Sequence, residues 1–334
     1  LLYQLDVNAQ RPNIYMVIID DARAFEFDNH AITPNLDNFQ MNATNYKHAF
    51  AQEAMCNASR SSFLTGLRPD RTGVHNTNSN FRNWLPNVKT LPQILMQNGY
   101  ETIGVGKIFH HKEKLAWSVD AIEDNRPDVG PFGYITDLNK QLSDSHGRGF
   151  PFESADVADS LYIDGWNSNR LIKSLLVIQN SANPIFAGIG FGKPHLPFTA
   201  PKKFWDLYST KRIDSLFNIL PKSRPSSRPD LTLNNSAELR KYFGVPLTAN
   251  LSDSLSKQLI HGYLACLSYI DHLFGQIVSH LKSTNQYDES MIIVFSDHGM
   301  KIGEYNTWSK HTNLEVDCKV PFTIKYPEQK KGAI

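Results

Sequence analysis

One segment near the start of the sequence indicates the fold class: Arg11-Pro12-Asn13-Ile14-Tyr15-Met16-Val17-Ile18-Ile19-Asp20-Asp21. Its apolar run from Ile14 to Ile19 is unbroken and rich in β-formers, which predicts a strand buried on both faces. Such strands are typical of parallel sheets, where ligands gather at the carboxyl ends. The two carboxylates that follow the run are therefore well placed to hold a cation. The alternative is that Asp20 or Asp21 caps the next segment.

Three further predicted strands also end in polar residues. Because the carboxyl ends of parallel strands meet at one edge of a sheet, these residues are expected to lie near Asp20 and Asp21. Taken singly, each has a structural alternative: a loop lysine is usually solvated, and a histidine between prolines can pack in a turn. The strands are 100–105, 184–189 and 291–295, followed by Gly106-Lys107-Ile108-Phe109-His110, Phe191-Gly192-Lys193-Pro194-His195-Leu196-Pro197-Phe198 and Ser296-Asp297-His298-Gly299.

Helical patterns separate these strands. They start at Thr33 and Pro34 and cover 90–98, 156–180 and 252–282, and another strand is expected at 320–324. This alternation predicts an α/β fold with a mixed, largely parallel sheet covered by helices on both faces. The segment 113–152 lacks a sustained period and is expected to be a long surface loop of the kind that often shapes a substrate pocket. The segment 209–250, rich in Ser, Pro and Lys and with little periodicity, is expected to be a second long loop.

A cysteine lies at the start of another predicted helix, in Met55-Cys56-Asn57-Ala58-Ser59-Arg60-Ser61-Ser62-Phe63-Leu64-Thr65-Gly66. No helix breaker interrupts the run from Ala58 to Leu64, and Gly66 supplies a stop. The sulfur of Cys56 would face the N–H groups of a helix N-terminus, which favour a nearby anion. The alternative is a small buried cysteine without chemistry.

This segment resembles the formylglycine signature Cys-x-Pro/Ala-x-Arg of the sulfatase family, with Cys56, Ala58 and Arg60 in the key positions. The resemblance covers nearly the whole chain from Arg11 onward. It implies the fold shared by alkaline phosphatases and sulfatases, and a formylglycine-generating enzyme that oxidises Cys56 to an aldehyde. Relatives continue into a smaller C-terminal subdomain. Residues 1–334 are therefore expected to form one catalytic domain that is truncated before, or separated from, that subdomain.

The resemblance also implies the site. Metal ligands of one Ca²⁺ would be Asp20, Asp21, Cys56, Asp297 and His298, although an imidazole suits a transition metal better than calcium. Hydrated formylglycine at Cys56, activated by the metal and Arg60, would attack the sulfate sulfur with one hydroxyl and expel sulfate with the other. The residues around the sulfate would be Lys107, His110, Lys193, His195 and Lys310, the last from the run Gly303-Glu304-Tyr305-Asn306-Thr307-Trp308-Ser309-Lys310.

Either His195 or Lys310 would protonate the departing sugar oxygen. His195 is preferred, because the ordinary pKa of an imidazole lies near working pH.

Three motifs together resemble the subgroup of iduronate 2-sulfatases: Gly-Lys-x-x-His, Lys-Pro-His-x-Pro-Phe and Ser-Asp-His-Gly. They imply sulfated glycosaminoglycan uronates as substrates, although substrate choice depends on the divergent loops. Another sulfatase, or a phosphonate or phosphodiester hydrolase of the same superfamily, is an alternative. So are a non-catalytic glycan-binding homologue that keeps the Cys56 thiol, and a fragment too incomplete to fold alone.

Composition sets the remaining limits. The chain has 334 residues, 41% of them hydrophobic, and a formal net charge of +1, so it has no basic field for nucleic acid. Its three cysteines form neither a disulfide framework nor a zinc motif. Sequons at Asn42, Asn234 and Asn250 fit a glycoprotein, and we expect a lysosomal or secreted protein, or a periplasmic one if bacterial. No apolar run reaches membrane-spanning length, and the chain, which starts without a signal segment, is expected to be a mature product or a fragment.

Overall fold

The computed structural model describes residues 11–24, 30–119, 130, 132–179, 181–223 and 237–327. Within them, six strands form the central sheet, in the order β2-β10-β7-β1-β5-β3. β1 pairs in parallel with β5 and β7, β5 pairs in parallel with β3, and β10 is antiparallel to β7 and β2. The predicted mixed, largely parallel sheet is thus confirmed. The strands are β1 (Ile14–Ile19), β2 (Thr44–Asn45), β3 (Glu101–Gly106), β5 (Ile185–Phe191), β7 (Met291–Ser296) and β10 (Phe322–Lys325).

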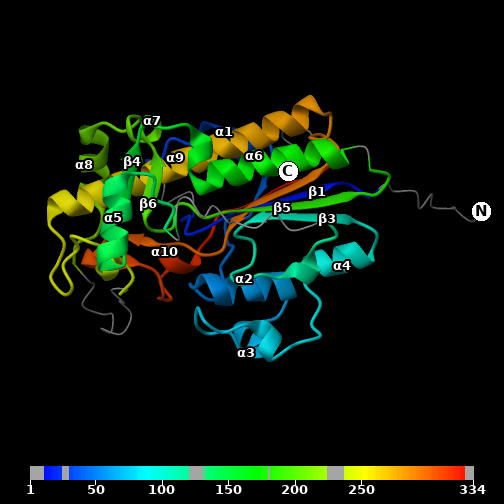
Figure 1. Ribbon diagram of the computed structural model, residues 1–334, viewed down its shortest axis with the longest axis horizontal. Coiled ribbons are helices and arrows are strands. Elements are labelled where there is room, and N and C mark those ends of the chain that lie inside the picture. The colour runs from blue at the N-terminus through cyan, green and yellow to red at the C-terminus, as the bar shows by residue number, and fades with distance from the viewer. Residues whose placement is uncertain are drawn as a thin grey trace, which may run out of the picture.

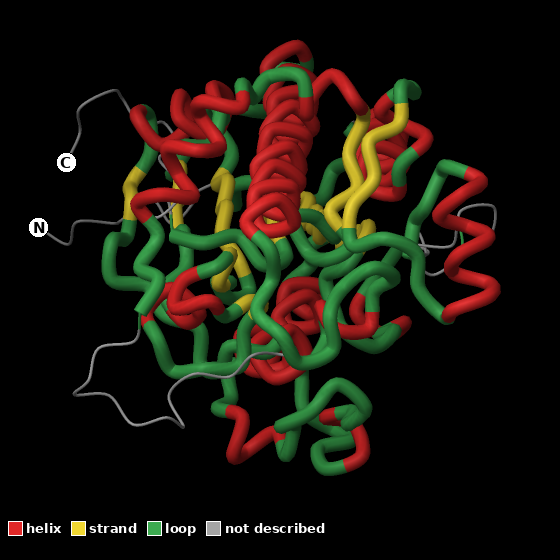
Figure 2. Tube along the Cα trace, turned by 90° about the vertical axis from the view of Figure 1, so that its left-hand side faces the viewer, coloured by secondary structure: helices red, strands yellow, loops and turns green. Residues whose placement is uncertain are grey.

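Helices cover both faces of this sheet, as predicted (Figure 1). α1, α6 and α9 lie on one face, and α2 and α4 lie on the other. A view turned by 90° shows the strands between the two helical layers (Figure 2). The helices are α1 (Pro34–Met41), α2 (Cys56–Thr65), α3 (Pro69–Thr72), α4 (Leu91–Gln97), α5 (Asp137–His146), α6 (Ile163–Ile178), α7 (Lys202–Trp205), α8 (Thr210–Ile219), α9 (Asp253–Ser283) and α10 (Glu315–Cys318).

The unbroken apolar run of β1 is explained by this layering. Successive side chains of a strand point to opposite faces, so Tyr15, Val17 and Ile19 pack into the core formed with α6 and α9. Met16 and Ile18 pack into a second core on the other face, together with residues of α2 and of the loop after β3. Neither face meets water, and β1 therefore has no position that favours a polar side chain.

The two segments expected to be long loops contain regular structure. Segment 113–152 includes α5, and segment 209–250 includes α8 and the short 3-10 helix η7 (Leu239–Lys241). The sequence of α5 has no apolar stripe that would indicate a helix, because Asn139 is its one buried residue. Its entry is fixed instead by Glu153, whose buried carboxylate accepts bonds from the backbone N–H groups of Ile135 at 2.7 Å and Thr136 at 3.1 Å. Residues 120–129 and 224–236, with the Asn234 sequon, lie outside the described residues.

Two smaller features differ from or add to the expectation. The helix predicted over 156–180 begins at Ile163, because Tyr162 has extended backbone (φ −82°, ψ 151°). Two short strand pairs flank the main sheet: β4 (Phe152–Ala155) with β6 (Phe198–Pro201), and β8 (Lys301–Ile302) with β9 (Trp308–Ser309). Among the described residues, none of the helices combines the length and the apolar character needed to cross a membrane.

The packing of α6 against the sheet predicts a contrast between two of its residues. Leu175 is fully buried in the core, whereas Val177 is 84% exposed. Leu175→Ala is expected to lower the free energy of unfolding by about 2–5 kcal/mol, because it leaves a cavity. Val177→Ala should change it by no more than about 0.5 kcal/mol. Urea denaturation followed by circular dichroism measures both values, and equal losses would contradict the described packing.

Candidate active site

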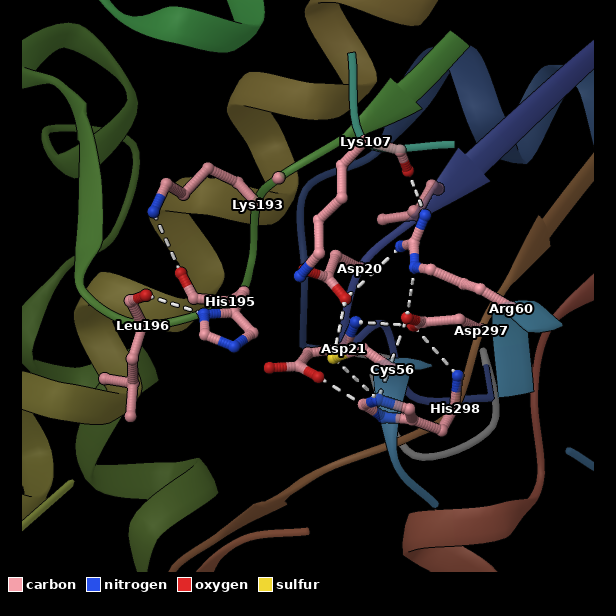
Figure 3. A network of polar contacts seen from close by, with 12 residues as sticks. Asp20, Asp21, Cys56, Arg60, Lys107, Lys193, His195, Leu196, Asp297 and His298 are labelled. Atoms are coloured by element: carbon pink, nitrogen blue, oxygen red, sulfur yellow. Dashed lines mark hydrogen bonds and ion pairs between the residues drawn. The ribbon is translucent and has the colours of Figure 1, made fainter. Parts of the chain in front are cut away.

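Polar residues from four parallel strands converge at the carboxyl edge of the sheet (Figure 3). Asp20 and Asp21 follow β1, Lys107 follows β3, and Asp297 and His298 follow β7. The loop that carries His195 follows β5. The structure thus brings together the groups that the sequence placed after separate strands.

Cys56 is the first residue of α2 and is buried among these groups. Its Sγ atom lies 3.4 Å from Asp20 Oδ1, 3.2 Å from His298 Nε2 and 3.3 Å from Lys310 Nζ. One turn further along α2, the hydroxyl of Ser59 donates to the backbone carbonyl of Asp297 at 2.6 Å. This bond fixes the start of α2 against the loop after β7. The helix ends at Gly66 in left-handed geometry (φ 70°), as its sequence predicts.

Arg60 links three strand ends. Its fully buried guanidinium donates from Nε to Asp297 Oδ2 at 2.9 Å, lies 3.3 Å from Asp20 Oδ1, and donates to the backbone carbonyls of Lys107 and Ile108. Burial opposes its charge, but Asp297 and Asp20 outweigh burial and hold the pKa of Arg60 above its usual value. Because its donors are engaged by protein groups, Arg60 acts here by holding the carboxylates in place.

Four residues can offer ligand atoms to one metal ion. Oxygens of Asp20 and Asp297, Cys56 Sγ and a His298 ring nitrogen lie within 4.8 Å of one another, and all four residues are buried. His298 Nδ1 lies 3.0 Å from the carbonyl of Gly299, so it carries the hydrogen in the neutral ring and leaves the lone pair of Nε2 toward Sγ. This donor set fits a divalent cation.

The charges around this group are strongly coupled. Burial alone would raise the pKa of Asp20, but Lys107 and Arg60 hold it well below its usual value. Burial and the nearby Asp20 raise the pKa of Asp297. Burial disfavours the imidazolium of His298, yet Asp297 and the Cys56 sulfur outweigh burial and raise its pKa to about 10. A bound cation would replace that proton, since metal ligation requires the neutral imidazole.

Asp21, predicted to be a metal ligand, lies outside this group of four among the described residues. Its carboxylate accepts two bonds from Lys310 Nζ, at 2.6 Å and 2.9 Å, and lies 3.2 Å from His298 Nδ1. Asp21 has left-handed backbone (φ 67°), as do Ser309 and His311 on either side of Lys310. Such strain in non-glycine residues is concentrated at functional sites. In this structure Asp21 fixes the position of Lys310.

Asp20, Cys56, Asp297 and His298 are called the cluster below. Two of the predicted sulfate-site cations lie beside it. Lys107 Nζ pairs with Asp20 Oδ2, and Lys310 Nζ lies between Asp21 and Cys56. His110 is half-buried in the loop after β3, and its buried Nδ1 finds no hydrogen-bond partner in the described part of the chain. Burial and the charge of Lys107 lower the pKa of His110 to about 4, so its ring is neutral.

The loop after β5 carries both His195 and Lys193, and the side chain of Lys193 points away from Cys56. The Asp164 carboxylate, in the first turn of α6, accepts from the backbone N–H groups of Gly192 at 2.7 Å and Lys193 at 2.9 Å. Lys193 Nζ donates to the carbonyls of His195 at 2.9 Å and Pro197 at 2.6 Å, and Figure 3 shows its side chain extending away from Cys56. Lys193 therefore stabilises its own loop in this structure and does not lie among the groups around the Cys56 sulfur.

The ring of His195 lies close to a backbone carbonyl and to a carboxylate. Its Nδ1 lies 2.6 Å from the carbonyl of Leu196, and its Nε2 lies 3.4 Å from Glu238 Oε1. Burial and the charge of Lys310 lower the pKa of His195 to about 3, so the ring is neutral with its hydrogen on Nδ1.

A cavity of about 790 Å³ adjoins the cluster. Asp20, Lys107 and His195 line it, together with residues from the segment 113–152, as predicted for that segment, and from the segment 209–250. Sequence reasoning missed Ser59 and Asp164, and it missed the lining residues Arg148 and Glu238. Ser59 occupies a variable position of the Cys-x-Ala-x-Arg signature, and the other three residues lie outside the motifs that follow the strands, so no sequence signal marked them.

Solved structures share this fold. A phosphonate monoester hydrolase from Silicibacter pomeroyi superposes with a TM-score of 0.75 at 20% identity, over 96% of this chain and 69% of that chain. The structure of BT4656 in complex with D-glucosamine-2-N,6-O-disulfate gives a TM-score of 0.65 at 20% identity, over 96% of this chain and 72% of that chain. At these identities the likeness shows the fold, which is the predicted alkaline-phosphatase and sulfatase type.

The amino-acid sequence is similar to those of two mammalian sulfatases. Iduronate 2-sulfatase of Mus musculus is 31% identical over 94% of this chain and 59% of its own length, and that of Homo sapiens is 30% identical over 94% and 60%. The chain thus spans about three fifths of these relatives. The family profile described as Sulfatase matches residues 12–333, and the chain therefore belongs to the sulfatase family.

Proposed function

We propose that this chain carries the active site of a sulfatase, which hydrolyses sulfate esters by means of a formylglycine made from Cys56. The observation that carries this proposal is the environment of the Cys56 sulfur. A buried thiol at a helix N-terminus lies within 3.4 Å of a carboxylate, an imidazole and an ammonium group. A structural cysteine gains nothing from such charged neighbours, whereas a nucleophile for an anionic substrate needs them.

The cations around Cys56 would bind the sulfate group. Lys107 and Lys310 each form an ion pair with a carboxylate, so their ammonium groups are positioned before substrate arrives. Preorganised charges of this kind stabilise negative charge that shifts in a transition state. His110 adds a buried ring nitrogen that is available for a further bond. Formylglycine, as its hydrate, would supply the attacking hydroxyl at the position of Cys56.

The metal would be held by Asp20, Asp297, His298 and the formylglycine made from Cys56, with Asp21 as a further predicted ligand. We propose Ca²⁺, because carboxylate oxygens dominate this set. The cation would supply Lewis-acid stabilisation of the sulfate oxygens.

His195 would protonate the departing sugar oxygen. Its ring is neutral without substrate, but a sulfate ester adds negative charge beside it, which favours the imidazolium. Glu238, at 3.4 Å from Nε2, favours it as well. Lys310 is the alternative donor, but Asp21 holds its ammonium and the pKa of Lys310 lies well above its usual value, against the effect of burial. Loss of a proton from Lys310 is therefore the more costly route.

The substrate would be a sulfated uronate of a glycosaminoglycan. The relatives named iduronate 2-sulfatase support this class, and the cavity of about 790 Å³ is large enough for a sugar unit. A phosphonate monoester hydrolase is a second candidate, favoured by the fold similarity. A lysosomal, secreted or periplasmic location would suit such substrates, and Asn250, which belongs to a sequon, is exposed.

Modification of Cys56 tests the proposal directly. Protein made together with the formylglycine-generating enzyme should show an aldehyde in place of the thiol in the peptide that contains Cys56, by mass spectrometry. Cys56→Ala should abolish sulfate release, because the nucleophile is lost. Cys318→Ala is the matched control, since the half-buried thiol of Cys318 bonds to the Thr312 carbonyl instead of the cluster. Full turnover by protein with an unmodified thiol would refute the proposed nucleophile.

Metal content provides a second test. Asp297→Asn should lose the ion and most activity, because a hard cation needs the carboxylate charge. Asp288→Asn, at an exposed position, is the control and should retain both. Elemental analysis by mass spectrometry measures the content, and a chelator should inactivate the wild type until Ca²⁺ is restored. Recovery with Zn²⁺ but not with Ca²⁺ would show that His298 selects a transition metal.

The role of His195 predicts a dependence on the leaving group. His195→Gln should lower kcat by about 10²–10⁴-fold on a sugar sulfate, because an alkoxide is a poor leaving group without a proton. An aryl sulfate with an acidic phenol should lose far less. Since the acid must be protonated in the complex, kcat of the wild type should fall as pH rises through the pKa of His195, and this limb should disappear in the variant. Equal losses on both substrates would assign the proton to another group.

A further inference from the structure

The cavity beside the cluster contains a cation that the proposed reaction does not use. Arg148 lies in the segment that follows α5, and its side chain is 23% exposed. It lines the same cavity as Asp20, Lys107 and His195. Glu238 connects the two regions, because its Oε1 atom lies 4.0 Å from Arg148 NH1 and 3.4 Å from His195 Nε2. Arg148 therefore lies near the proposed acid His195.

Two aromatic rings hold the guanidinium in place. Its central carbon lies 5.1 Å from the ring centroid of Phe132 and 4.8 Å from that of Tyr242, and both rings line the cavity. Arg148 also forms a side-chain hydrogen bond with Tyr242, which fixes the guanidinium further. Ring contacts of this kind stabilise a cation, and a guanidinium carries five N–H donors, of which this bond uses one. The neighbouring backbone is also fixed, because Phe150 N donates to Asn139 Oδ1 at 2.9 Å and its carbonyl accepts from Tyr134 at 2.6 Å. Arg148 is thus preorganised.

The other cations of the cavity already have close partners. Lys107 pairs with Asp20, and Lys193 bonds to two backbone carbonyls within 2.9 Å. The carboxylate nearest to Arg148 among the described residues is that of Glu238, 4.0 Å from its NH1 atom, which is beyond hydrogen-bond length. Glu238 also lies 3.4 Å from His195 Nε2, so its carboxylate has another partner. A second anion can therefore bind Arg148 without breaking a short ion pair.

We propose that Arg148 binds a carboxylate of the substrate and so determines specificity for sulfated uronates. This inference rests on the proposed function and assigns a residue to its substrate class. A planar guanidinium matches a carboxylate with two parallel N–H···O bonds, which a neutral hydroxymethyl group cannot form. Uronates would thus be preferred over hexoses that carry the same sulfate.

The test compares two substrates that differ at one carbon: a hexuronate 2-sulfate and the hexose 2-sulfate with a hydroxymethyl group in place of the carboxylate. Wild-type protein with formylglycine should prefer the uronate in kcat/KM. Arg148→Gln should lower kcat/KM for the uronate by about 10- to 100-fold, mainly through KM, and lower the preference by the same factor. Arg148→Lys should retain part of the preference, because charge remains while the planar fork is lost.

Arg170→Gln is the matched control. Its guanidinium carbon lies 4.3 Å from the ring centroid of Trp166 on α6, a similar contact made by a residue that does not line the cavity. This variant should keep the wild-type ratio. An unchanged ratio in Arg148→Gln, or an equal loss on both substrates, would overturn the inference.

If the proposed function is wrong, the result differs from that of a wrong role for Arg148, because wild-type protein would then release sulfate from neither substrate. Calorimetric titration with the sulfate-free hexuronate would in that case decide the role of Arg148 by itself. Binding to the wild type that is lost in Arg148→Gln supports the carboxylate site. Equal binding to both proteins, or binding to neither, overturns it.

Discussion

The buried guanidinium of Arg60 is the interaction on which the rest of the site depends. It contacts Asp20 after β1, Asp297 after β7, and two backbone carbonyls after β3. Buried charges are tolerated only when they are paired and hydrogen-bonded, and removal of one partner leaves the others uncompensated. Arg60 therefore fixes three strand ends and neutralises two of the three carboxylates gathered there. Its place in α2 also sets the position of Cys56, one helical turn earlier.

The two lysines near the Cys56 sulfur are likewise paired with carboxylates. Lys107 is held by Asp20, and Lys310 by Asp21, so each ammonium group that faces the sulfur has a carboxylate behind it. This arrangement fixes cations in a buried site, where the proposed reaction would use them to bind a sulfate. The left-handed backbone at Asp21, Ser309 and His311 shows that local strain accompanies it. Dense pairing around the site supplies the contacts that maintain this strain.

Sequence could predict the sheet and most of the cluster because both depend on local patterns. The apolar run of β1 requires two covered faces, and acidic or basic residues directly after a strand can only emerge at one edge. The direction in which a side chain points is harder to predict from sequence. Lys193 belongs to the Lys-Pro-His-x-Pro-Phe motif, yet its ammonium group donates to two backbone carbonyls of its own loop. α5 escaped prediction for a related reason, since Glu153 fixes its start through contacts that no local pattern records.

The groups around Cys56 and the residues that line the rest of the cavity come from different parts of the fold. In the proposed function, the first set would carry out the reaction and the second would select the substrate. The cluster around Cys56 stands on strands and on one helix, where packing on both sides leaves little freedom. Phe132, Arg148, Glu238 and Tyr242 come instead from the two segments without periodicity, and they reach the same cavity. Changes in those segments can alter the lining of the cavity without moving the groups around Cys56. In the proposed reaction, such changes would alter which alcohol is accepted. Family membership, carried by the strand ends, therefore constrains the reaction more tightly than the substrate.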